Sequence, residues 1–383
     1  MSITTPVGFA AAGVAAGIKA SGKPDLSLVV NLGPSRAAAA VFTSNRVFAA
    51  PVRWSREAVA DGRLSAVVLN SGGANACTGD AGYADSVATA RAVGRSLDLP
   101  EDEVGVCSTG LIGVRLPIDR VLHGVSMAAG ALSSDGGPAA ARAIMTTDSV
   151  PKEAAVTREG WSVGGMAKGA GMLAPGLATM LVVLTTDADL PATALDASLR
   201  SATRVTLDRA DSDGCMSTND TVFLLASGAS GIAPGADDFT EALTEVCDSL
   251  ARQLIADAEG ASHEIAITVT NAATEDDAVE VARAVARSNL FKAAVFGNDP
   301  NWGRVLSAVG TTSAAFRAED LDVSFNGVQV CRGGEIGEDR SLVDLRPRAV
   351  DVTIDLHAGA ASAIVLTNDL TYDYVKENAE YSS

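Results

Sequence analysis

Residues 168–187 read KGAGMLAPGLATMLVVLTTD, and the bond between Ala178 and Thr179 separates two different kinds of chain within them. The part before this bond is rich in glycine and proline, which favours a loop. The part after it, 180–184, is an unbroken apolar run of the kind that forms a strand buried on both faces. The pattern therefore predicts that the hydroxyl of Thr179 lies where a loop meets a buried strand.

A hydroxyl residue in that position suits a nucleophile that the chain makes by cutting itself. Cleavage of the bond between Ala178 and Thr179 would give Thr179 a free α-amine beside its own hydroxyl, so that one residue carries both base and nucleophile. The pKa of an unperturbed α-amine is about 7.7–8, and a nearby cation such as Lys168 would lower it. Threonine by itself also begins ordinary strands, because β-branched residues favour them, so the prediction depends on the whole local motif.

Acyl transfer at such a nucleophile needs hydrogen-bond donors that stabilise the oxyanion. Thr109 and Gly110 follow a predicted strand at 104–107 and offer a hydroxyl and a backbone N–H on a tight turn. One donor of this kind is typically worth about 3–4 kcal/mol of transition-state stabilisation. We therefore expect Thr109 and Gly110 to lie beside Thr179.

The composition of the 383-residue chain indicates a globular, layered protein that binds neither nucleic acid nor membrane. Its hydrophobic fraction is 47% and its aromatic fraction only 4%, so small side chains would pack the core of an α/β fold. The net charge of -18 argues against phosphate binding, which needs clustered Lys and Arg. No apolar run reaches the roughly 18–20 residues of a membrane helix. The apolar stretch at 6–18 lacks a preceding basic residue, so we expect it to form the edge of the folded domain.

Cysteine and histidine are sparse, which limits the chemistry. The five cysteines form no CxxC pair, and the three histidines form no HExxH motif. A zinc site and a disulfide framework are therefore both disfavoured, and a cytoplasmic location is expected. Cys107 and Ser108 lie at a predicted strand end, as nucleophiles often do, but no histidine stands in a motif-like context to activate them.

Two further motifs suggest other kinds of site and fail on their context. Residues 169–174 match the loose dinucleotide pattern GxGxxG/A, but Pro175 and Gly176 stop the helix that would hold the pyrophosphate. The acidic loop at 208–220 is similar to a calcium loop, yet Arg209 occupies the position of the first carboxylate ligand. We therefore expect a structural turn there and no metal site.

Short β-rich runs alternate with amphipathic segments along the chain, which predicts a layered α/β architecture without internal repeats. The clearest amphipathic helix is predicted at 237–258, and Thr274 with Asp277 predicts a capped start for a helix at 274–288. The glycine-containing stretch 228–238 is the predicted seam between subdomains. The other predicted helices are 81–97, 116–132 and 192–206, and the other predicted strands are 26–31, 66–69, 220–226, 264–270, 323–330 and 350–356.

The segment 168–181 resembles the self-cleavage signature of the ornithine acetyltransferases, the bifunctional enzymes of arginine biosynthesis. The resemblance covers essentially the whole chain, because further segments match blocks of this family in the same order. These segments are NSGGANACTG at 70–79, STGLIG at 108–113, MTTD at 145–148, TND at 218–220 and GNDPNWGR at 297–304. One departure is Gly176, where asparagine or serine is commoner; it loosens the loop and should not remove the chemistry.

The resemblance implies self-cleavage between Ala178 and Thr179 into an α chain, 1–178, and a β chain, 179–383, that assemble as an α2β2 heterotetramer. It implies an αββα-type layered sandwich, which shares the idea of an N-terminal nucleophile with the Ntn hydrolases but differs from them in topology. A smaller α/β subdomain is expected in the C-terminal half, at about 238–345.

The resemblance also implies the reaction, in which Thr179 takes the acetyl group of N2-acetyl-L-ornithine and passes it to L-glutamate by a ping-pong mechanism. Thr109 and Gly110 match the oxyanion pair of the family. No metal or redox cofactor is required, and acetyl-CoA, a second donor in the bifunctional subclass, is a candidate co-substrate. The positions that match substrate-binding residues of the family are Thr146, Lys168, Thr179, Glu259, Asn378 and Ser383.

Glu259 also has a physical argument of its own. It ends the helix predicted at 237–258, where the helix dipole disfavours an anion by up to about 1 kcal/mol, so a carboxylate there makes sense facing a substrate ammonium. Asn378 and Ser383 lie in a polar tail that would ordinarily fray. The resemblance implies instead that this tail closes the site.

Two alternatives to the acetyltransferase remain open from the sequence. One is an amidohydrolase or aminopeptidase of the same N-terminal nucleophile type, in which water replaces glutamate. The other is a non-catalytic protein that binds a small molecule and keeps an uncut chain.

Overall fold

The computed structural model describes residues 2–174 and 180–380. The predicted cleavage point at Ala178 and Thr179 and the predicted substrate contact at Ser383 lie outside the described residues.

The described chain forms two compact units. The first contains residues 2–174, 180–208 and 215–254, and the second contains 209–214 and 255–380. The division falls near the end of α6 (Ala236–Ala256), and the seam that was predicted at 228–238 is wrong. That stretch is bonded back to the end of β8 (Leu181–Thr186) in the first unit, because the N–H of Ser230 donates to the carbonyl oxygen of Asp187 at 3.0 Å.

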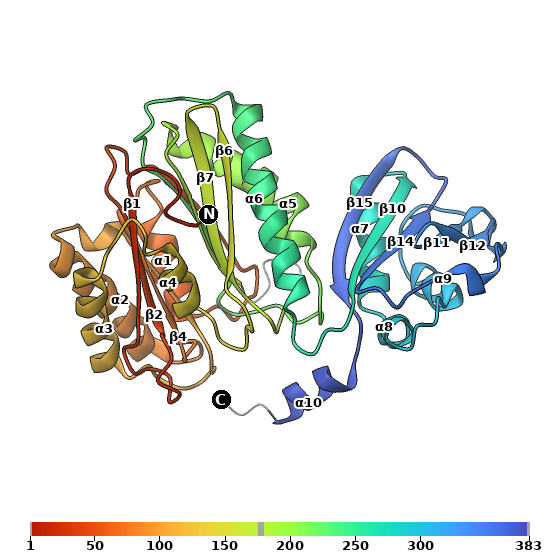
Figure 1. Cartoon of the computed structure of the whole chain (residues 1–383), viewed down its shortest axis with the longest axis horizontal. Coiled ribbons are helices and arrows are strands. Elements are labelled where there is room, and N and C mark those ends of the chain that lie inside the picture. The colour runs from red at the N-terminus through yellow and green to blue at the C-terminus, as the bar shows by residue number, and fades with distance from the viewer. Residues whose placement is uncertain (1, 175–179, 381–383) are drawn as a thin grey trace. The chain divides into compact units, whose positions relative to one another are not determined.

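Two sheets form the centre of the first unit (Figure 1). One has the strand order β1 (Phe9–Val14), β2 (Leu26–Asn31), β4 (Ala66–Ser71), β5 (Val104–Thr109). The other has the order β3 (Ala38–Phe42), β9 (Thr221–Ala226), β8 (Leu181–Thr186), β7 (Trp161–Lys168), β6 (Lys152–Arg158). Neighbouring strands are antiparallel, except that β4 pairs with β5 and β8 with β9 in parallel.

Alternation along the strands assigns each sheet an inner and an outer face. The inner faces pack against each other, so that Val67 and Cys107 of the first sheet share a core with Val183 and Phe223 of the second. On the outer face of the first sheet, α2 (Gly79–Leu97) and α3 (Ile118–Gly130) cover a second core, which is made by Leu28, Val30, Val68, Val106, Val93 and Val125.

The outer face of the second sheet is covered by helices as well. On β7, a Cβ at Gly165 would lie about 3 Å from Val246 and Leu250 of α6 (Ala236–Ala256). The helix α5 (Ala192–Val205) lies beside α6, since Ser198 and Thr240 are hydrogen-bonded at 2.8 Å. The order helix, sheet, sheet, helix is the αββα sandwich that was expected, so the fold class is confirmed.

The sequence pattern that begins at Met180 forms a strand as predicted. All six residues of β8 are buried, as an unbroken apolar run requires when both faces of a sheet are covered. The apolar stretch near the N-terminus forms the edge strand β1, which confirms that it belongs to the folded domain. Two short helices complete the first unit, α1 (Ala50–Ala58) and α4 (Gly137–Ala143).

The second unit has one six-stranded sheet. Its order is β13 (Glu335–Ile336), β12 (Val328–Arg332), β11 (Asp322–Phe325), β14 (Ala349–Asp355), β10 (Glu264–Ala272), β15 (Ala361–Asn368). Its core includes Ile267, Val352 and Val365 of the sheet and Val281 and Val285 of α7. Its helices are α7 (Glu275–Ala286), α8 (Asn289–Phe296), α9 (Trp302–Val309) and α10 (Tyr372–Glu380). Short 3-10 turns in the chain are Glu101–Glu103, Leu207–Arg209, Ala318–Asp320 and Arg340–Leu342.

One predicted strand of this unit, 323–330, is wrong because it is a hairpin. Asn326 and Gly327 have φ values of 46° and 84°, the left-handed conformation of a two-residue hairpin turn. The chain reverses there, so β11 and β12 pair antiparallel with each other.

In the part of the chain that the structure describes, no helix is both long and apolar enough to cross a membrane.

Candidate active site

The parallel strands β4 and β5 end at one edge of the first sheet, and the predicted oxyanion pair lies there. Thr109 is the last residue of β5, and its carbonyl oxygen accepts a hydrogen bond from the N–H of Gly73 at 3.0 Å. Gly110 has a φ of +133°, and a Cβ on it would lie 2.5 Å from the nitrogen of Gly73. Only glycine fits this close approach of two backbones, so the residue type follows from geometry.

Lys168 ends β7 in the second sheet and reaches the end of β5. Its side chain is buried, and its Nζ lies 3.3 Å from Oγ1 of Thr109. A lysine ammonium can only donate, so the Thr109 oxygen accepts this bond and its own proton stays available for another acceptor. The packing of the two sheets therefore brings Thr109, Gly110 and Lys168 together.

A buried carboxylate lies next to Lys168. Oδ1 of Asp148 is 2.7 Å from Nζ of Lys152 and accepts from the N–H of Gly169 at 2.7 Å, while Oδ2 accepts from the N–H of Thr146 at 2.9 Å. Burial alone raises the pKa of Asp148, but Lys168 and Lys152 outweigh it and lower that pKa to about 2. Asp148 is therefore ionised, and it joins Thr146 to the start of the loop after β7.

Lys19 adds another ammonium to this part of the molecule. Its Nζ donates to the carbonyl oxygen of Met145 at 2.7 Å. Burial lowers the pKa of Lys19 against the opposing charges of Asp25 and Asp148, and Lys168 lowers it further. Sequence reasoning missed Lys19, because its only visible property was to follow an apolar stretch.

Asp220 fixes the start of β8. Its Oδ1 accepts from the N–H of Met180 at 3.1 Å, and Met180 follows Thr179 in the chain. Burial raises the pKa of Asp220 well above its usual range. Asp220 stands in the block 218–220, but sequence reasoning assigned it no role.

Asn219, from the same block, links the second sheet to the end of the first. Its Nδ2 donates to the carbonyl oxygens of Ala74 at 2.6 Å and Ser108 at 2.8 Å. Ser108 directly precedes Thr109, so this amide helps to hold the predicted oxyanion turn in position.

Glu259 and Asn378, two other predicted substrate-binding residues, belong to the second unit. Glu259 lies in a turn beyond α6, which ends at Ala256, so the helix-dipole argument for Glu259 is wrong. Asn378 is an exposed residue of α10, and its Nδ2 donates to the carbonyl oxygen of Tyr374 at 3.0 Å. Burial and the charge of Glu259 raise the pKa of Glu377, so the turn and α10 lie close together within this unit.

Other candidate chemistry has little support from the structure. Burial raises the pKa of the Cys107 thiol far above its usual range, and the side chain packs between the two sheets, where it is a poor nucleophile. Among the residues that the structure describes, no group of three or more His, Cys, Asp or Glu side chains is arranged to hold a metal ion.

Comparisons with known proteins find a matching family model, curated relatives over the full length of the chain and related solved structures. A sequence model of the ArgJ family matches residues 10–383. The arginine biosynthesis bifunctional protein ArgJ of Streptomyces coelicolor is 64% identical over 383 residues, and that of Thermobifida fusca is 60% identical; each match covers 100% of both chains. The solved ornithine acetyltransferase of Mycobacterium tuberculosis, in complex with ornithine, is 56% identical with a TM-score of 0.45, over 47% of this chain and 96% of that one.

These findings define an acyltransferase of arginine biosynthesis built on a layered α/β fold. More particularly, the chain belongs to the ArgJ family. The resemblance to the ornithine acetyltransferases is thereby confirmed, and it is supported over the hydrolase and the non-catalytic binding protein.

Proposed function

We propose that the protein transfers the acetyl group of N2-acetyl-L-ornithine to L-glutamate through an acetyl ester on Thr179. The observation that carries this proposal is the contact between Nζ of Lys168 and Oγ1 of Thr109 at the ends of β7 and β5. It supplies a cation and an oriented hydroxyl at the end of β7, the last strand before the proposed cleavage point in the sequence.

The nucleophile is made by cleavage between Ala178 and Thr179, which gives the chains 1–178 and 179–383. The hydrogen bond from Met180 to Asp220 supports this step, because it anchors the residue directly after Thr179. Lys168, the last residue of β7, pairs with Leu181, the first residue of β8. The two strands that flank the proposed cleavage point in the sequence therefore have these ends side by side in the sheet.

In the acetyl transfer, the α-amine of Thr179 takes the hydroxyl proton, and Oγ attacks the acetyl carbonyl carbon. The Thr109 hydroxyl and the Gly110 N–H donate to the oxyanion. The carbon–nitrogen bond of acetylornithine then breaks, and the amine of Thr179 returns the proton to the leaving ornithine. Glutamate enters with its amine unprotonated, attacks the ester, and restores the Thr179 hydroxyl.

The proposed substrate contacts are Thr146, Lys168, Glu259, Asn378 and Ser383. The hydrogen bond of Thr146 to Asp148, which lies beside Lys168, supports the first two. Acetyl-CoA is proposed as a second acetyl donor, and the two chains are proposed to assemble as α2β2 in the cytoplasm.

A denaturing gel tests the cleavage. The wild type should give two bands with the masses of 1–178 and 179–383, and Thr179→Ala should give one uncut band. Thr157→Ala, at an exposed position of β6, is the matched control and should be cut normally. A wild type that stays as one band under conditions that allow assembly would contradict the proposed cleavage.

A transfer assay separates the acetyltransferase from a hydrolase. With acetylornithine that is radiolabelled in its acetyl group, the label should appear in acetylglutamate and not in free acetate. A second reaction with acetyl-CoA and no acetylornithine tests the second donor. Label that appears as acetate at the same rate with and without glutamate would support the hydrolase instead.

A further inference from the structure

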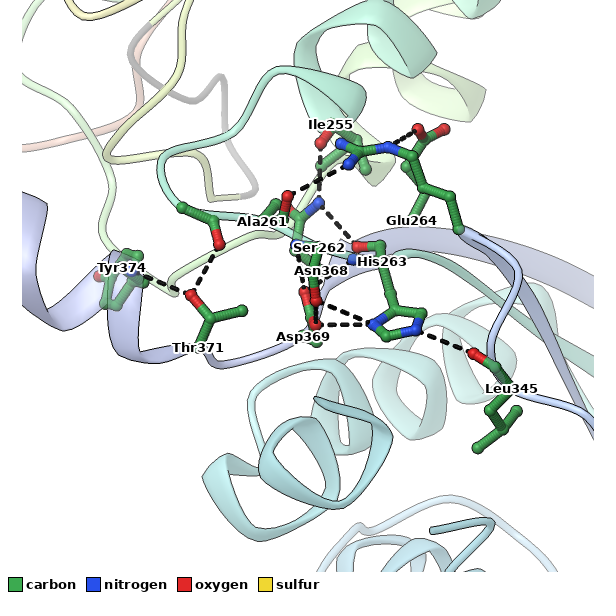
Figure 2. A network of polar contacts seen from close by, with 12 residues as sticks. Ile255, Ala261, Ser262, His263, Glu264, Leu345, Asn368, Asp369, Thr371 and Tyr374 are labelled. Carbon is green, nitrogen blue, oxygen red and sulfur yellow. Dashed lines mark hydrogen bonds and ion pairs between the residues drawn. The ribbon is translucent and has the colours of Figure 1, made fainter. Parts of the chain in front are cut away.

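A buried histidine–aspartate pair lies in the second unit near the N-terminal end of α10 (Figure 2). His263 precedes β10, and Asp369 directly follows β15. Nδ1 of His263 is 2.7 Å from Oδ2 of Asp369, and Nε2 is 2.9 Å from the carbonyl oxygen of Leu345. Neither residue belongs to the catalytic groups described above.

Hydrogen bonds engage every polar side-chain atom of this pair. The carbonyl oxygen of Leu345 can only accept, so Nε2 of His263 donates to it. Asp369 accepts from the backbone N–H groups of Ser262 and His263, both at 2.9 Å, and from the Ser262 hydroxyl. The Ser262 oxygen also lies 3.1 Å from Nδ1 of His263, so this hydroxyl contacts both members of the pair.

The same network attaches the turn at Gly260 to the first turn of α10. Oγ1 of Thr371 donates to the carbonyl oxygen of Gly260 at 2.6 Å and accepts from the N–H of Tyr374 at 2.9 Å, so it also caps the helix. Gly260 has a φ of +62°, and a Cβ on it would lie 2.1 Å from the nitrogen of Tyr374. The turn and the helix are thus in direct backbone contact.

Apolar burial contributes little to the attachment of α10. Within the described part of this helix, no residue is buried, and Tyr372 and Val375 are 82% and 57% exposed. One aromatic contact accompanies the polar network, with the ring centroids of Phe296 and Tyr372 5.4 Å apart. The position of α10 in the second unit therefore depends mainly on directional polar contacts, which include those of His263 and Asp369.

We propose that His263 and Asp369 are positioning residues of the substrate site, which hold the turn that carries Glu259 and the helix that carries Asn378 in one fixed arrangement. The inference rests on the proposed function, since Glu259 and Asn378 are substrate contacts there. Neither member of the pair touches substrate; each acts through the elements it holds. A buried hydrogen-bonded pair with all of its polar positions filled specifies one geometry, which apolar contact of an exposed helix does not.

Hydrogen exchange tests the attachment without any measurement of activity. Asp369→Asn keeps the size of the side chain and replaces one acceptor oxygen with a donor group, and it should speed exchange of the α10 amides at least about tenfold while the amides of β14 stay protected. Gly260→Ala should have the same effect by steric displacement. Gly327→Ala, also at a left-handed glycine but with open space around its Cβ, is its control and should leave α10 unchanged. Normal exchange of α10 in both test variants would overturn the proposal.

Kinetics test the consequence for substrate binding. In Asp369→Asn and His263→Gln, KM for acetylornithine and for glutamate should rise about tenfold or more, with kcat within about twofold, because uniform substrate binding is weakened and the reacting groups are untouched. Self-cleavage should be complete. His357→Gln, which alters the exposed pair of His357 with Asp322, should leave both constants unchanged.

The two kinds of failure can be told apart. Unchanged KM in a variant whose α10 exchanges faster would overturn the positioning role. A wild type that transfers no acetyl group would overturn the proposed function, whereas the exchange experiment would still report on the attachment of α10.

Discussion

Thr109 has a single hydroxyl proton, and its direction decides what the residue can do. Because the Lys168 ammonium donates to the Thr109 oxygen, the proton is directed toward a different acceptor. In the proposed mechanism that acceptor is the oxyanion, which the N–H of Gly110 also faces. Lys168 would then have two effects: it orients this hydroxyl and it lowers the pKa of the α-amine of Thr179.

Thr109→Val keeps the shape of the side chain and removes the hydroxyl. We expect kcat for acetyl transfer to fall about 10²–10³-fold, the typical loss for one oxyanion donor. Thr109→Ser retains the hydroxyl and should keep most of the activity. Steady-state transfer from acetylornithine to glutamate measures the difference, and equal activity of the two variants would contradict the role of the hydroxyl.

Asp148 should make stability depend on pH. Its pKa is lowered from 3.8 to about 2 in the folded protein, so its contribution is present above about pH 4 and is lost as the pH falls through about 2. The contribution is about 2 kcal/mol. In urea unfolding, the difference in free energy of unfolding between wild type and Asp148→Asn should therefore narrow as the pH falls below about 4. Asp351→Asn, at an exposed position of β14, is the control for loss of a carboxyl, and a difference for Asp148→Asn that stays constant down to the acid limit of folding would refute the prediction.

At the scale of an element, the turn after β5 contains two left-handed glycines with different surroundings. Gly110 packs against the backbone of Gly73, whereas a Cβ at Gly113, with φ +85°, would meet nothing within 4 Å. The turn therefore needs glycine at Gly110 for space and at Gly113 for backbone conformation alone.

Gly110→Ala should shift the turn and reduce kcat at least about tenfold, because displacement of catalytic groups by about 1 Å can cost up to about 10²-fold. Gly113→Ala should cost about 1–2 kcal/mol of stability through backbone strain and leave kcat near the wild-type value. Transfer kinetics and urea unfolding of both variants test this pair. Equal kcat in the two would show that the close approach to Gly73 has no functional role.

The elements that could be predicted from sequence are those with a local cause. The apolar run after Met180 forms β8, and the capped start predicted from Thr274 is confirmed, since its Oγ1 accepts from the N–H of Asp277 at 3.1 Å. The turn at 326–327 was missed although Asn-Gly is typical of a two-residue hairpin turn and the apolar alternation changes phase there, from Val323 and Phe325 to Val328 and Val330.

The site was less predictable, because its contacts are not local. Lys19 bonds to Met145 across 126 positions, and Asp220 bonds to Met180 across 40. No periodicity in the sequence reports such pairs. Thr109, Gly110 and Lys168 were accessible only because the chain resembles a known family and because a nucleophile needs oxyanion donors and a cation.

At the scale of the whole molecule, the two units have separate cores. The core of the second unit is formed by residues between Ile265 and Val365, and those of the first unit lie between its own sheets and helices. A defect inside one core should therefore have its main effect within that unit.

Ile354→Ala removes a fully buried side chain from the core of the second unit. We expect a loss of about 2–5 kcal/mol, typical of a large-to-small substitution in a core. Hydrogen exchange should accelerate in β10 and β14 and stay slow in β8. Equal acceleration in both units would show that they unfold as one.

The strand order β3, β9, β8, β7, β6 has a consequence for the cut chain. Under the proposed cleavage, β8 and β9 belong to the fragment 179–383, and they lie between β3 and β7 of the fragment 1–178. The fragment 1–178 would thus lack the strands β9 and β8 from the middle of this sheet, and the fragment 179–383 would lack the strands on either side of them. Separation of the two fragments would have to break the ladder between β3 and β9 and the ladder between β7 and β8. If the proposed cleavage takes place, the uncut precursor would have to fold before it is cut, and each fragment would be made in a one-to-one ratio with the partner from the same chain.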